Sequence, residues 1–241
     1  MSDPDLNSRK EAQELHAAAV PFRSAKFGDV IAFGAYPQTA GGADRTPVAW
    51  RVLRNSGDEL FVVSEYLLDC KRYHGEYVVT TWRDCDLRMW LNSEFYEAAF
   101  TTAERQLIKL TRCGDNGEGS PDTEDRVFLL SVAEIKDFTD PRDGNSSAIR
   151  RRTVGTEFAR AAKPDGCRLY VYDKGVEKDY IVEDGVRRGC SWWWTRTQLQ
   201  IHDGRSSRAA FIGARSNIKS YGRVDLRYYG VRPALKIRLE G

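Results

Sequence analysis

The sequence has no long hydrophobic run. It contains no stretch of about 18 consecutive apolar residues, the length that a membrane-spanning helix needs, so no membrane span or membrane partner is expected. The first residues, Met1 to Leu15, are rich in charged side chains and lack the apolar centre of a signal peptide. We therefore expect a cytoplasmic protein as encoded, and leave open its display on a phage particle or a cell surface.

Cysteine and histidine are scarce and poorly spaced for metal chemistry. Of the 5 cysteines none forms a CxxC pair, and none of the 3 histidines lies at zinc-ligand spacing from a cysteine. An odd number of cysteines without a secretion signal predicts reduced thiols. We expect neither a metal ion nor another cofactor.

An excess of charge of one sign is also lacking. Lys and Arg number 37 against 35 Asp and Glu, a net charge of +2, so a nucleic-acid partner is not expected. The run Arg150-Arg151-Arg152 indicates an exposed basic face more than a phosphate contact. Phosphate-binding loops, dinucleotide fingerprints, nucleophile elbows and the calcium motifs of lectins are missing. The sequence therefore does not predict an enzyme or a calcium-dependent sugar site.

What the chain does have is enough hydrophobic sequence for a substantial core. Its 241 residues are 41% hydrophobic, which suits one large domain or two small ones. Strand patterns lie near both ends, and short helical patterns lie between them. This order predicts an α+β fold with high loop content, in which a mixed or antiparallel sheet joins the N- and C-terminal strands. We assign residues 27–241 to this domain and residues 1–26 to a helical appendage.

The strand patterns give specific pairings. A strand is predicted over Asp29 to Phe33, ended by Gly34. A hairpin around the turn at 56–58 joins strands over 48–53 and 60–63. Further strands are expected over 126–130 and in a second hairpin, 168–172 with 179–182, which turns at Lys174-Gly175.

The helical patterns come with capping signals. Asp84 or Thr81 is expected to cap a helix that contains Leu87, Trp90 and Leu91. Two sequences of the capping-box type, Thr101-x-x-Glu104 and Ser131-x-x-Glu134, predict further helix starts. Helices are also expected over 5–20, 93–100 and 153–162.

Two C-terminal motifs dominate the sequence: Gly189 to Arg196, with three consecutive tryptophans, and Gly230 to Leu235. On a strand, Trp192 and Trp194 face one way and Trp193 the other, so the strand must be covered on both faces or offer one aromatic face to a ligand. Arg196 and Arg232 are expected to bind backbone or carboxylate groups inside the scaffold.

Several motifs in order resemble a bacterial domain of uncharacterised function with a C-type-lectin-like fold, near the formylglycine-generating-enzyme branch. The resemblance covers about residues 27–239 and rests on the following segments: Ile31-x-Phe33-Gly34-x-Tyr36-Pro37-Gln38, Val48-x-Trp50-x-Val52-Leu53, Ser64-x-x-Leu67-Leu68-Asp69, Trp82-x-x-x-Asp86-Leu87-Arg88-x-Trp90-Leu91-Asn92, Ala99-Phe100, Val127 to Ser131, Trp193-Trp194-x-Arg196 and Gly230 to Leu235. It implies the C-type-lectin-like fold. Members of that branch include the variable proteins of diversity-generating retroelements, which display varied side chains on a rigid scaffold.

Residues 197–229 are similar to such a variable segment, because hydrophilic positions of mixed type interrupt an apolar skeleton. Tyr and Arg are enriched in binding hot spots, so we expect this segment to bind a protein or other macromolecular ligand. The candidate ligand-binding residues are Trp194, Gln198, Gln200, His202, Arg205, Ser207, Arg208, Arg215, Asn217, Lys219, Tyr221, Arg223, Asp225, Arg227 and Tyr228.

Two alternative functions remain open at this point. A formylglycine-generating type of oxidase would use Cys190 as a reactive thiol, and would need a depressed thiol pKa near an open pocket. A structural or phage-particle protein would instead use the segment 197–229 for a fixed subunit contact. The oligomeric state is not predicted by the sequence.

Overall fold

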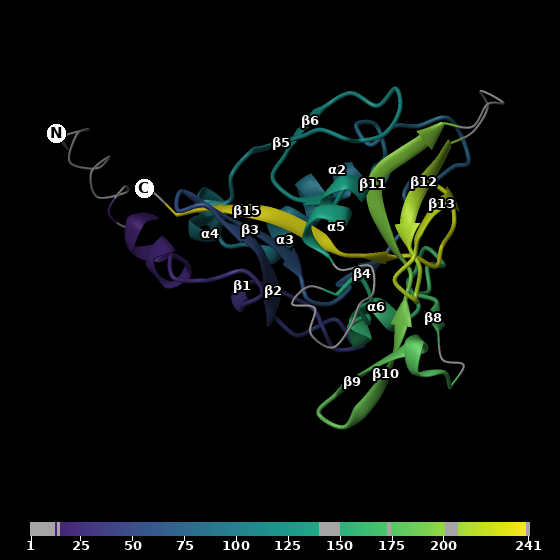
Figure 1. Cartoon of the computed structure of the whole chain (residues 1–241), viewed down its shortest axis with the longest axis horizontal. Coiled ribbons are helices and arrows are strands. Elements are labelled where there is room, and N and C mark those ends of the chain that lie inside the picture. Colours follow the sequence, from purple (N-terminus) through teal and green to yellow (C-terminus); the bar gives the residue numbers. More distant parts are fainter. Residues whose placement is uncertain (1–12, 14, 140–149, 173–174, 201–206, 240–241) are drawn as a thin grey trace.

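Among the residues that the structure describes, two five-stranded sheets organise the molecule (Figure 1). The computed structural model describes residues 13, 15–139, 150–172, 175–200 and 207–239. The first sheet has the antiparallel order β1-β2-β3-β15-β7. Its strands are β1 (Val30–Tyr36), β2 (Thr46–Asn55), β3 (Glu59–Ser64), β15 (Pro233–Arg238) and β7 (Phe128–Leu129). Because β15 pairs with β3, this sheet joins the two ends of the domain, as predicted.

The second large sheet has the order β13-β12-β11-β14-β4. Its strands are β13 (Ile218–Arg223), β12 (Ser207–Ile212), β11 (Trp193–Gln200), β14 (Gly230–Val231) and β4 (Asp69–Cys70). The pairing of β11 with β14 is parallel and the other pairings are antiparallel. The two C-terminal motifs therefore lie side by side: Trp193 is in register with Gly230, whose amide donates to the carbonyl of Trp192 over 2.8 Å.

A smaller sheet, β8-β10-β9, extends below the two large ones in Figure 1. It contains β8 (Val171–Tyr172), β9 (Tyr180–Glu183) and β10 (Val186–Ser191). The predicted hairpin between 168–172 and 179–182 is wrong, because both segments pair with β10 instead. The reason is the turn at Asp184 and Gly185, whose φ angles of 51° and 77° suit the two-residue type I′ turn that joins adjacent strands. A two-stranded ribbon of β5 (Thr111–Cys113) and β6 (Thr123–Asp125) completes the sheets of the described residues.

The helices are short and lie between the strands in sequence. They are α2 (Asp86–Trp90), the π-helical turn η2 (Leu91–Phe95), α3 (Tyr96–Ala99), α4 (Thr102–Leu107), α5 (Val132–Phe138), α6 (Glu157–Arg160) and the 3-10 turns η1 (Val20–Phe22) and η3 (Glu177–Asp179). With mostly antiparallel sheets and few short helices, the fold is mixed α+β. None of the helices among the described residues has the length and apolar character of a membrane span.

Both predicted capping boxes are present, at Thr101 before α4 and at Ser131 before α5. The predicted cap of α2 is wrong, because the Cys85 sulfur accepts from the amide of Arg88 while Asp84 accepts from the Thr81 hydroxyl over 2.7 Å. The helix predicted over 153–162 is reduced to α6. Its first residues are extended instead, since Thr153 donates to the carbonyl of Glu65 over 2.8 Å.

Strand β1 continues through Gly34, where the sequence predicted its end. Gly34 has a φ of +66°, and the pairing with β2 shifts register there. A Cβ at this position would lie 2.6 Å from the ring of Phe100. The glycine therefore allows a close approach and a bulge inside the strand, which a sequence pattern cannot distinguish from a strand end.

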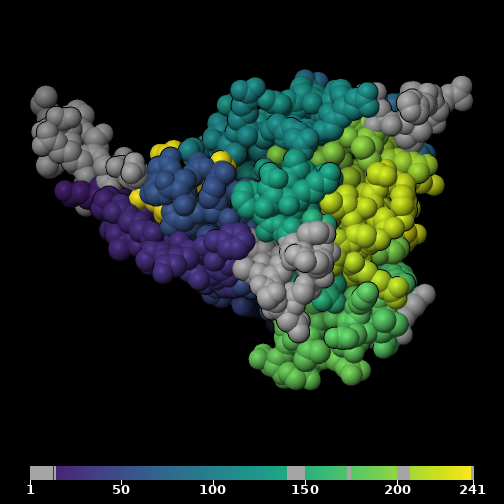
Figure 2. All heavy atoms as spheres, in the orientation of Figure 1, coloured from purple at the N-terminus to yellow at the C-terminus, as the bar shows by residue number. Residues whose placement is uncertain are grey.

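The buried residues form one main core and a smaller satellite core. The main core holds Trp50, Trp82, Trp193 and Trp194, all with 1% exposure or less. The satellite core consists of Val154, Ile181, Cys190 and Ala214. In Figure 2 the green-to-yellow surface of β12 and β13 lies on the side of the molecule away from the purple N-terminal segment.

The described part of the N-terminal segment contacts the first sheet. Residues 15–19 are helical, and the ring of Phe22 packs edge-on against Phe33 with centroids 5.7 Å apart. The Arg23 side chain donates to the carbonyl of Leu239 over 3.1 Å. The helix predicted over 5–20 otherwise lies outside the described residues.

Candidate ligand-binding site

The tryptophan strand β11 is a frame and not itself a contact surface. Trp193 and Trp194 are fully buried, and their indole nitrogens donate to the carbonyls of Arg151 and Lys71, each over 3.0 Å. Trp194 also stacks on Tyr229 with centroids 3.9 Å apart. Trp194 was a candidate ligand contact, but its burial makes it a scaffold residue.

Trp192 is the tryptophan that reaches the surface. It is half-buried at the junction of β10 and β11, and one ring partner is Tyr170 at a centroid distance of 4.6 Å. Phe211 of β12 contacts it at 5.9 Å, and Tyr229, the residue before β14, at 5.7 Å. These rings fix the indole in place, with part of it open to a cavity.

That cavity, which we name the aromatic pocket, has a volume of about 270 Å³. Small-molecule and side-chain sites are typically concave, aromatic and supplied with a few placed polar groups. The pocket is lined by Tyr172, Trp192, Phe211, Gly213, Ala214, Arg215, Asn217, Lys219, Tyr221 and Tyr229. Its residues therefore come from β8, the β10–β11 junction, β12, the β12–β13 turn, β13 and the segment before β14.

The turn between β12 and β13 supplies part of the pocket wall. The amide of Gly213 donates to the carbonyl of Asn217 over 2.8 Å, and the amide of Ser216 donates to the carbonyl of Gly213 over 3.0 Å. At Gly222 on β13, a Cβ would lie 2.6 Å from the Trp194 ring. The missing side chain lets β13 approach the frame closely and places Tyr221 edge-on to Phe211 at 5.5 Å.

The charged side chains that line the pocket are those of Arg215 and Lys219, and both are cations. The Arg215 side chain, 44% exposed, forms an ion pair with the fully buried carboxylate of Asp179 at 2.6 Å. That hydrogen bond raises the pKa of Arg215. The ammonium of Lys219 lies 5.9 Å from the centroid of Tyr221. Because Asp179 offsets Arg215, Lys219 gives the pocket its net positive charge.

The family described as Domain of unknown function (DUF6273) matches residues 57–239. The chain belongs to the DUF6273 family. The match includes every residue that lines the aromatic pocket. Comparisons with curated proteins and with solved structures found no match.

Within the DUF6273 domain, four candidate residues line the pocket: Arg215, Asn217, Lys219 and Tyr221. Five other candidates lie on the surface or half-buried outside the pocket. Arg223 pairs with Asp225 at 2.8 Å, and Arg227 and Tyr228 are exposed. Arg208 is half-buried on β12, opposite Arg223.

Gln198 and Ser207 are candidates that the structure places inside the molecule. Gln198 is 1% exposed, and its side-chain amide donates to the Ser207 hydroxyl over 3.3 Å. Ser207 in turn donates to the carbonyl of Thr80 over 3.0 Å and accepts from the Thr80 amide. These polar groups link strands to a loop, so their assignment to the binding surface is corrected. The Gln200 side chain, His202 and Arg205 lie outside the described residues.

The sequence interpretation missed Tyr172, Ala214 and Tyr229. Tyr172 lies two residues after Tyr170 in a segment that was correctly predicted as a strand. The strand predicted to pair with it was wrong, so the residues that surround Tyr172 could not be predicted. Burial raises the pKa of Tyr229 to about 12, so its phenol is uncharged at neutral pH.

Arg196 and Arg232 are scaffold residues, as expected. Arg196 is 3% exposed, donates to the carbonyls of Leu129 and Gly114 at 2.7 and 2.9 Å, and pairs with Glu134. Arg232 donates to the carbonyl of Ser64 over 2.9 Å.

The cysteines are buried and none is in a disulfide. Cys190 is 0% exposed and belongs to the satellite core. A reactive thiol needs an accessible sulfur, and Cys190 does not meet that requirement of the oxidase alternative. The Cys70 thiol donates to the carbonyl of Arg227 over 3.4 Å.

Proposed function

We propose that this DUF6273 domain is a ligand-binding module with the aromatic pocket as its site. In this proposal the scaffold is C-type-lectin-like, and residues 197–229 are the diversified segment of a retroelement variable protein. The partner is a protein, which presents an apolar side chain to the rings of the pocket and an acidic group to Lys219. Rings and cations of this kind are typical of interface hot spots.

The observation that supports the proposal most is the composition of the pocket wall. Four candidate residues of the predicted segment, Arg215, Asn217, Lys219 and Tyr221, line the pocket together with Trp192 and Tyr172, which belong to other parts of the chain. The frame residues beneath, Trp194 and Phe211, are 3% exposed or less. A rigid floor and a polar rim are therefore separate sets of residues.

Because the floor and the rim are separate sets of residues, rim residues can be substituted with little effect on stability. Asn217 and Tyr221 are exposed, and substitutions at exposed positions usually change stability by less than about 0.5 kcal/mol. Phe211, Ile212 and Val224 are buried and fix the backbone of the same segment. The segment can thus present different side chains on one backbone.

A direct test is selection from a random-peptide display library with the wild-type protein as bait. We expect the enriched peptides to combine an aromatic or aliphatic residue with Asp or Glu. Their dissociation constants, measured by fluorescence anisotropy, should rise at least about tenfold in Tyr221→Ser, because a hot-spot side chain is removed.

Tyr228→Ser is the matched control. Tyr228 is the same residue type and is similarly exposed, at 45% against 54% for Tyr221, but it does not line the pocket. Peptides that bind Tyr221→Ser and wild type equally would contradict the assignment of the pocket. Enrichment of no peptide at all would contradict a protein partner.

The retroelement part of the proposal has its own test. Sequencing of the DNA next to the gene should reveal a reverse transcriptase and a near-copy of the 3′ end that differs only at adenines. A neighbourhood without both would remove diversification from the proposal and leave ligand binding to the peptide experiment.

A further inference from the structure

The wall of the aromatic pocket contains two polar side chains whose donors are not taken up by the described part of the chain. The Lys219 ammonium is half-buried and forms no ion pair there, and its contact is the ring of Tyr221. The Asn217 carboxamide is exposed and forms no hydrogen bond with a described residue. Arg215, in contrast, is bound in a two-pronged way by Asp179, at 2.6 and 3.2 Å.

The two donors and a ring lie on one side of one stretch of chain. Asn217, Lys219 and Tyr221 follow one another at intervals of two residues, and side chains at this spacing point to the same face of a strand. The missing side chain of Gly213 makes room for the Asn217 carboxamide. The Lys219 ammonium lies 5.9 Å from the centroid of Tyr221. A place for an anion therefore adjoins a place for an apolar group.

The floor of the pocket is aromatic and held in position. Trp192 stacks on Tyr170 at a centroid distance of 4.6 Å, and Phe211 packs edge-on against Tyr229 at 4.9 Å. No carboxylate of the described residues lines the pocket. An apolar side chain that enters would be removed from water without the rings having to move, which lowers the entropy lost on binding.

The size of the pocket limits what can enter it. Its volume of about 270 Å³ lies just below the range of about 300–1,000 Å³ that is usual for sites of small molecules, so it suits one residue and not a longer stretch of chain. In an extended peptide, neighbouring side chains point to opposite sides, so an apolar residue and an adjacent Asp or Glu cannot both enter. One residue carries an apolar side chain and a carboxylate together only at the C-terminus of a chain.

The basic run 150–152 does not offer a comparable anion site. Arg150 and Arg152 are half-buried, and Arg151 is 6% exposed and donates to the Thr139 hydroxyl over 2.6 Å. Arg151 and Arg152 also interact with further residues. The prediction that this run forms an exposed face is therefore wrong, and its charges are not counted toward ligand binding.

We propose that the aromatic pocket binds the C-terminal residue of a protein partner, with the apolar side chain against the rings and the α-carboxylate at Lys219 and Asn217. This inference rests on the proposed function and specifies the acidic group as the end of the partner chain. A carboxylate can accept from an ammonium and from an amide N–H at once. Hydrogen bonds to an ionised group are about twice as strong as neutral ones.

The test uses fluorescein-labelled hexapeptides, in which Gly-Ser-Gly-Ser-Gly is followed by Leu, Phe or Trp. Each is made with a free C-terminal carboxylate and as the C-terminal amide, and its dissociation constant for the full chain is measured by fluorescence anisotropy. We expect the free acid of at least one peptide to bind about tenfold more tightly than its amide, because the amide lacks the charge that Lys219 binds.

A third form of each peptide has one Gly added after the apolar residue. It keeps the carboxylate but moves it away from the apolar side chain by the length of one residue. It should bind about as weakly as the amide, which separates recognition of the terminal residue from a general attraction of anions to the protein.

Lys219→Met should remove the difference between acid and amide, because it keeps an unbranched apolar side chain and loses the charge. Lys219→Arg should restore most of the difference. The matched control is Lys71→Met, since Lys71 is also half-buried and also faces a ring, with its ammonium 4.5 Å from the Trp90 centroid, but does not line the pocket. A purely structural role of Lys219 would instead weaken acid and amide equally.

Equal binding of acid and amide, equal binding after the added Gly, or an unchanged difference in Lys219→Met would each overturn this inference. So would the absence of binding by every hexapeptide. If peptides from the display library still bind through Tyr221 in any of these cases, the proposed function stands and only the terminal carboxylate is refuted. If Lys219→Met does not fold, as judged by circular dichroism, the comparison of the three peptide forms on the wild-type protein decides alone.

Discussion

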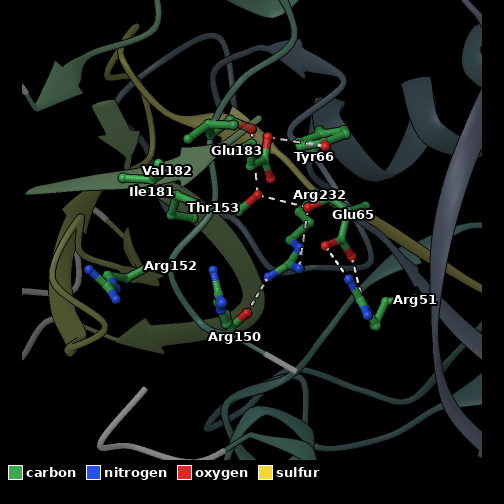
Figure 3. A pocket seen from close by; sticks show the side chains of 11 residues that line it. Arg51, Glu65, Tyr66, Arg150, Arg152, Thr153, Ile181, Val182, Glu183 and Arg232 are labelled. Carbon is green, nitrogen blue, oxygen red and sulfur yellow. Dashed lines mark hydrogen bonds and ion pairs between the residues drawn. The ribbon is translucent and has the colours of Figure 1, made fainter. Parts of the chain in front are cut away.

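The aromatic pocket differs in what holds it together from a second cavity, the arginine pocket (Figure 3), which is lined by Arg51, Glu65, Tyr66, Arg150, Arg152, Thr153, Val154, Ile181, Val182, Glu183 and Arg232. Val154 and Ile181 of the satellite core line the arginine pocket, while Ala214 lines the aromatic pocket. The aromatic pocket is made of rings that pack on one another, such as Phe211 and Tyr229 at 4.9 Å. The arginine pocket is made of charged groups that hold one another and the backbone.

This difference determines which pocket can change its residues. The rim residues Asn217 and Tyr221 are exposed and contribute little to the core, so their side chains can be replaced, whereas Arg215 pairs with the buried carboxylate of Asp179. Loss of a buried arginine in the other pocket would leave polar groups without partners, at a cost of several kcal/mol. Residues can therefore change at a lower cost in stability on the rim of the aromatic pocket than in the arginine pocket.

The largest expected effect is on the arginine pocket. Arg232→Met should lower the free energy of unfolding by about 2–5 kcal/mol, because the carbonyls of Ser64 and Arg150 would each lose a buried donor, at about 1–3 kcal/mol per group. Urea denaturation measures this, with Lys219→Met as the control on the aromatic rim. A loss below about 1 kcal/mol, the range of an exposed ion pair, would show that Arg232 does not hold this region together.

The next largest effect on stability is expected at Trp192, which lines the aromatic pocket. Trp192→Ala should lower the free energy of unfolding by about 2–3 kcal/mol, less than a fully buried tryptophan, because its indole is half-buried. Urea denaturation measures this loss, with Trp193→Ala as the comparison because Trp193 is fully buried. A loss in Trp192→Ala as large as in Trp193→Ala would contradict the difference in burial between the two rings.

A smaller, pH-dependent effect is expected at Glu65. Burial opposes the charge of this carboxylate, but the Arg51 hydrogen bond and the charges of Arg232, Arg51 and Arg150 together lower its pKa below the ordinary 4.5. A depressed pKa stabilises the fold above pH 4.5, and this stabilisation is lost as the pH falls through the folded-state value.

Glu65→Gln should therefore lower the free energy of unfolding by about 1–2 kcal/mol at neutral pH, and the difference from wild type should shrink in acid. Urea denaturation at several pH values measures it. A difference that stays constant from neutral pH into acid would contradict the role of the Glu65 charge.

Local signals in the sequence predicted much of this architecture. The two capping boxes, the hairpin of β2 and β3 and the scaffold roles of Arg196 and Arg232 each depend on short motifs or on the chemistry of one side chain. The family match also begins later than the predicted resemblance, at residue 57.

The wrong predictions concern residues whose burial and contacts depend on segments that are distant in the sequence. Polar residues of β11 were interpreted as surface, yet β11 is covered on both faces. Thr195 donates to the carbonyl of Ala210 over 2.9 Å, and Gln198 donates to Ser207. Neither the pairing of β8 with β10 nor the meeting of Arg150, Arg152 and Arg232 in one cavity has a signal within a single stretch of sequence.

The smallest expected effect tests the central claim, that a rigid frame holds an exchangeable surface. The measurement is the melting temperature of a variant with Arg208, Asn217, Tyr221 and Arg227 all changed to Ser. Four exposed or half-buried substitutions should lower it by no more than about 4–8 °C. Gly222→Ala, one added methyl group at 2.6 Å from the Trp194 ring, should lower it more. A four-site variant that melts below Gly222→Ala, or unfolds without a cooperative transition, would contradict the account.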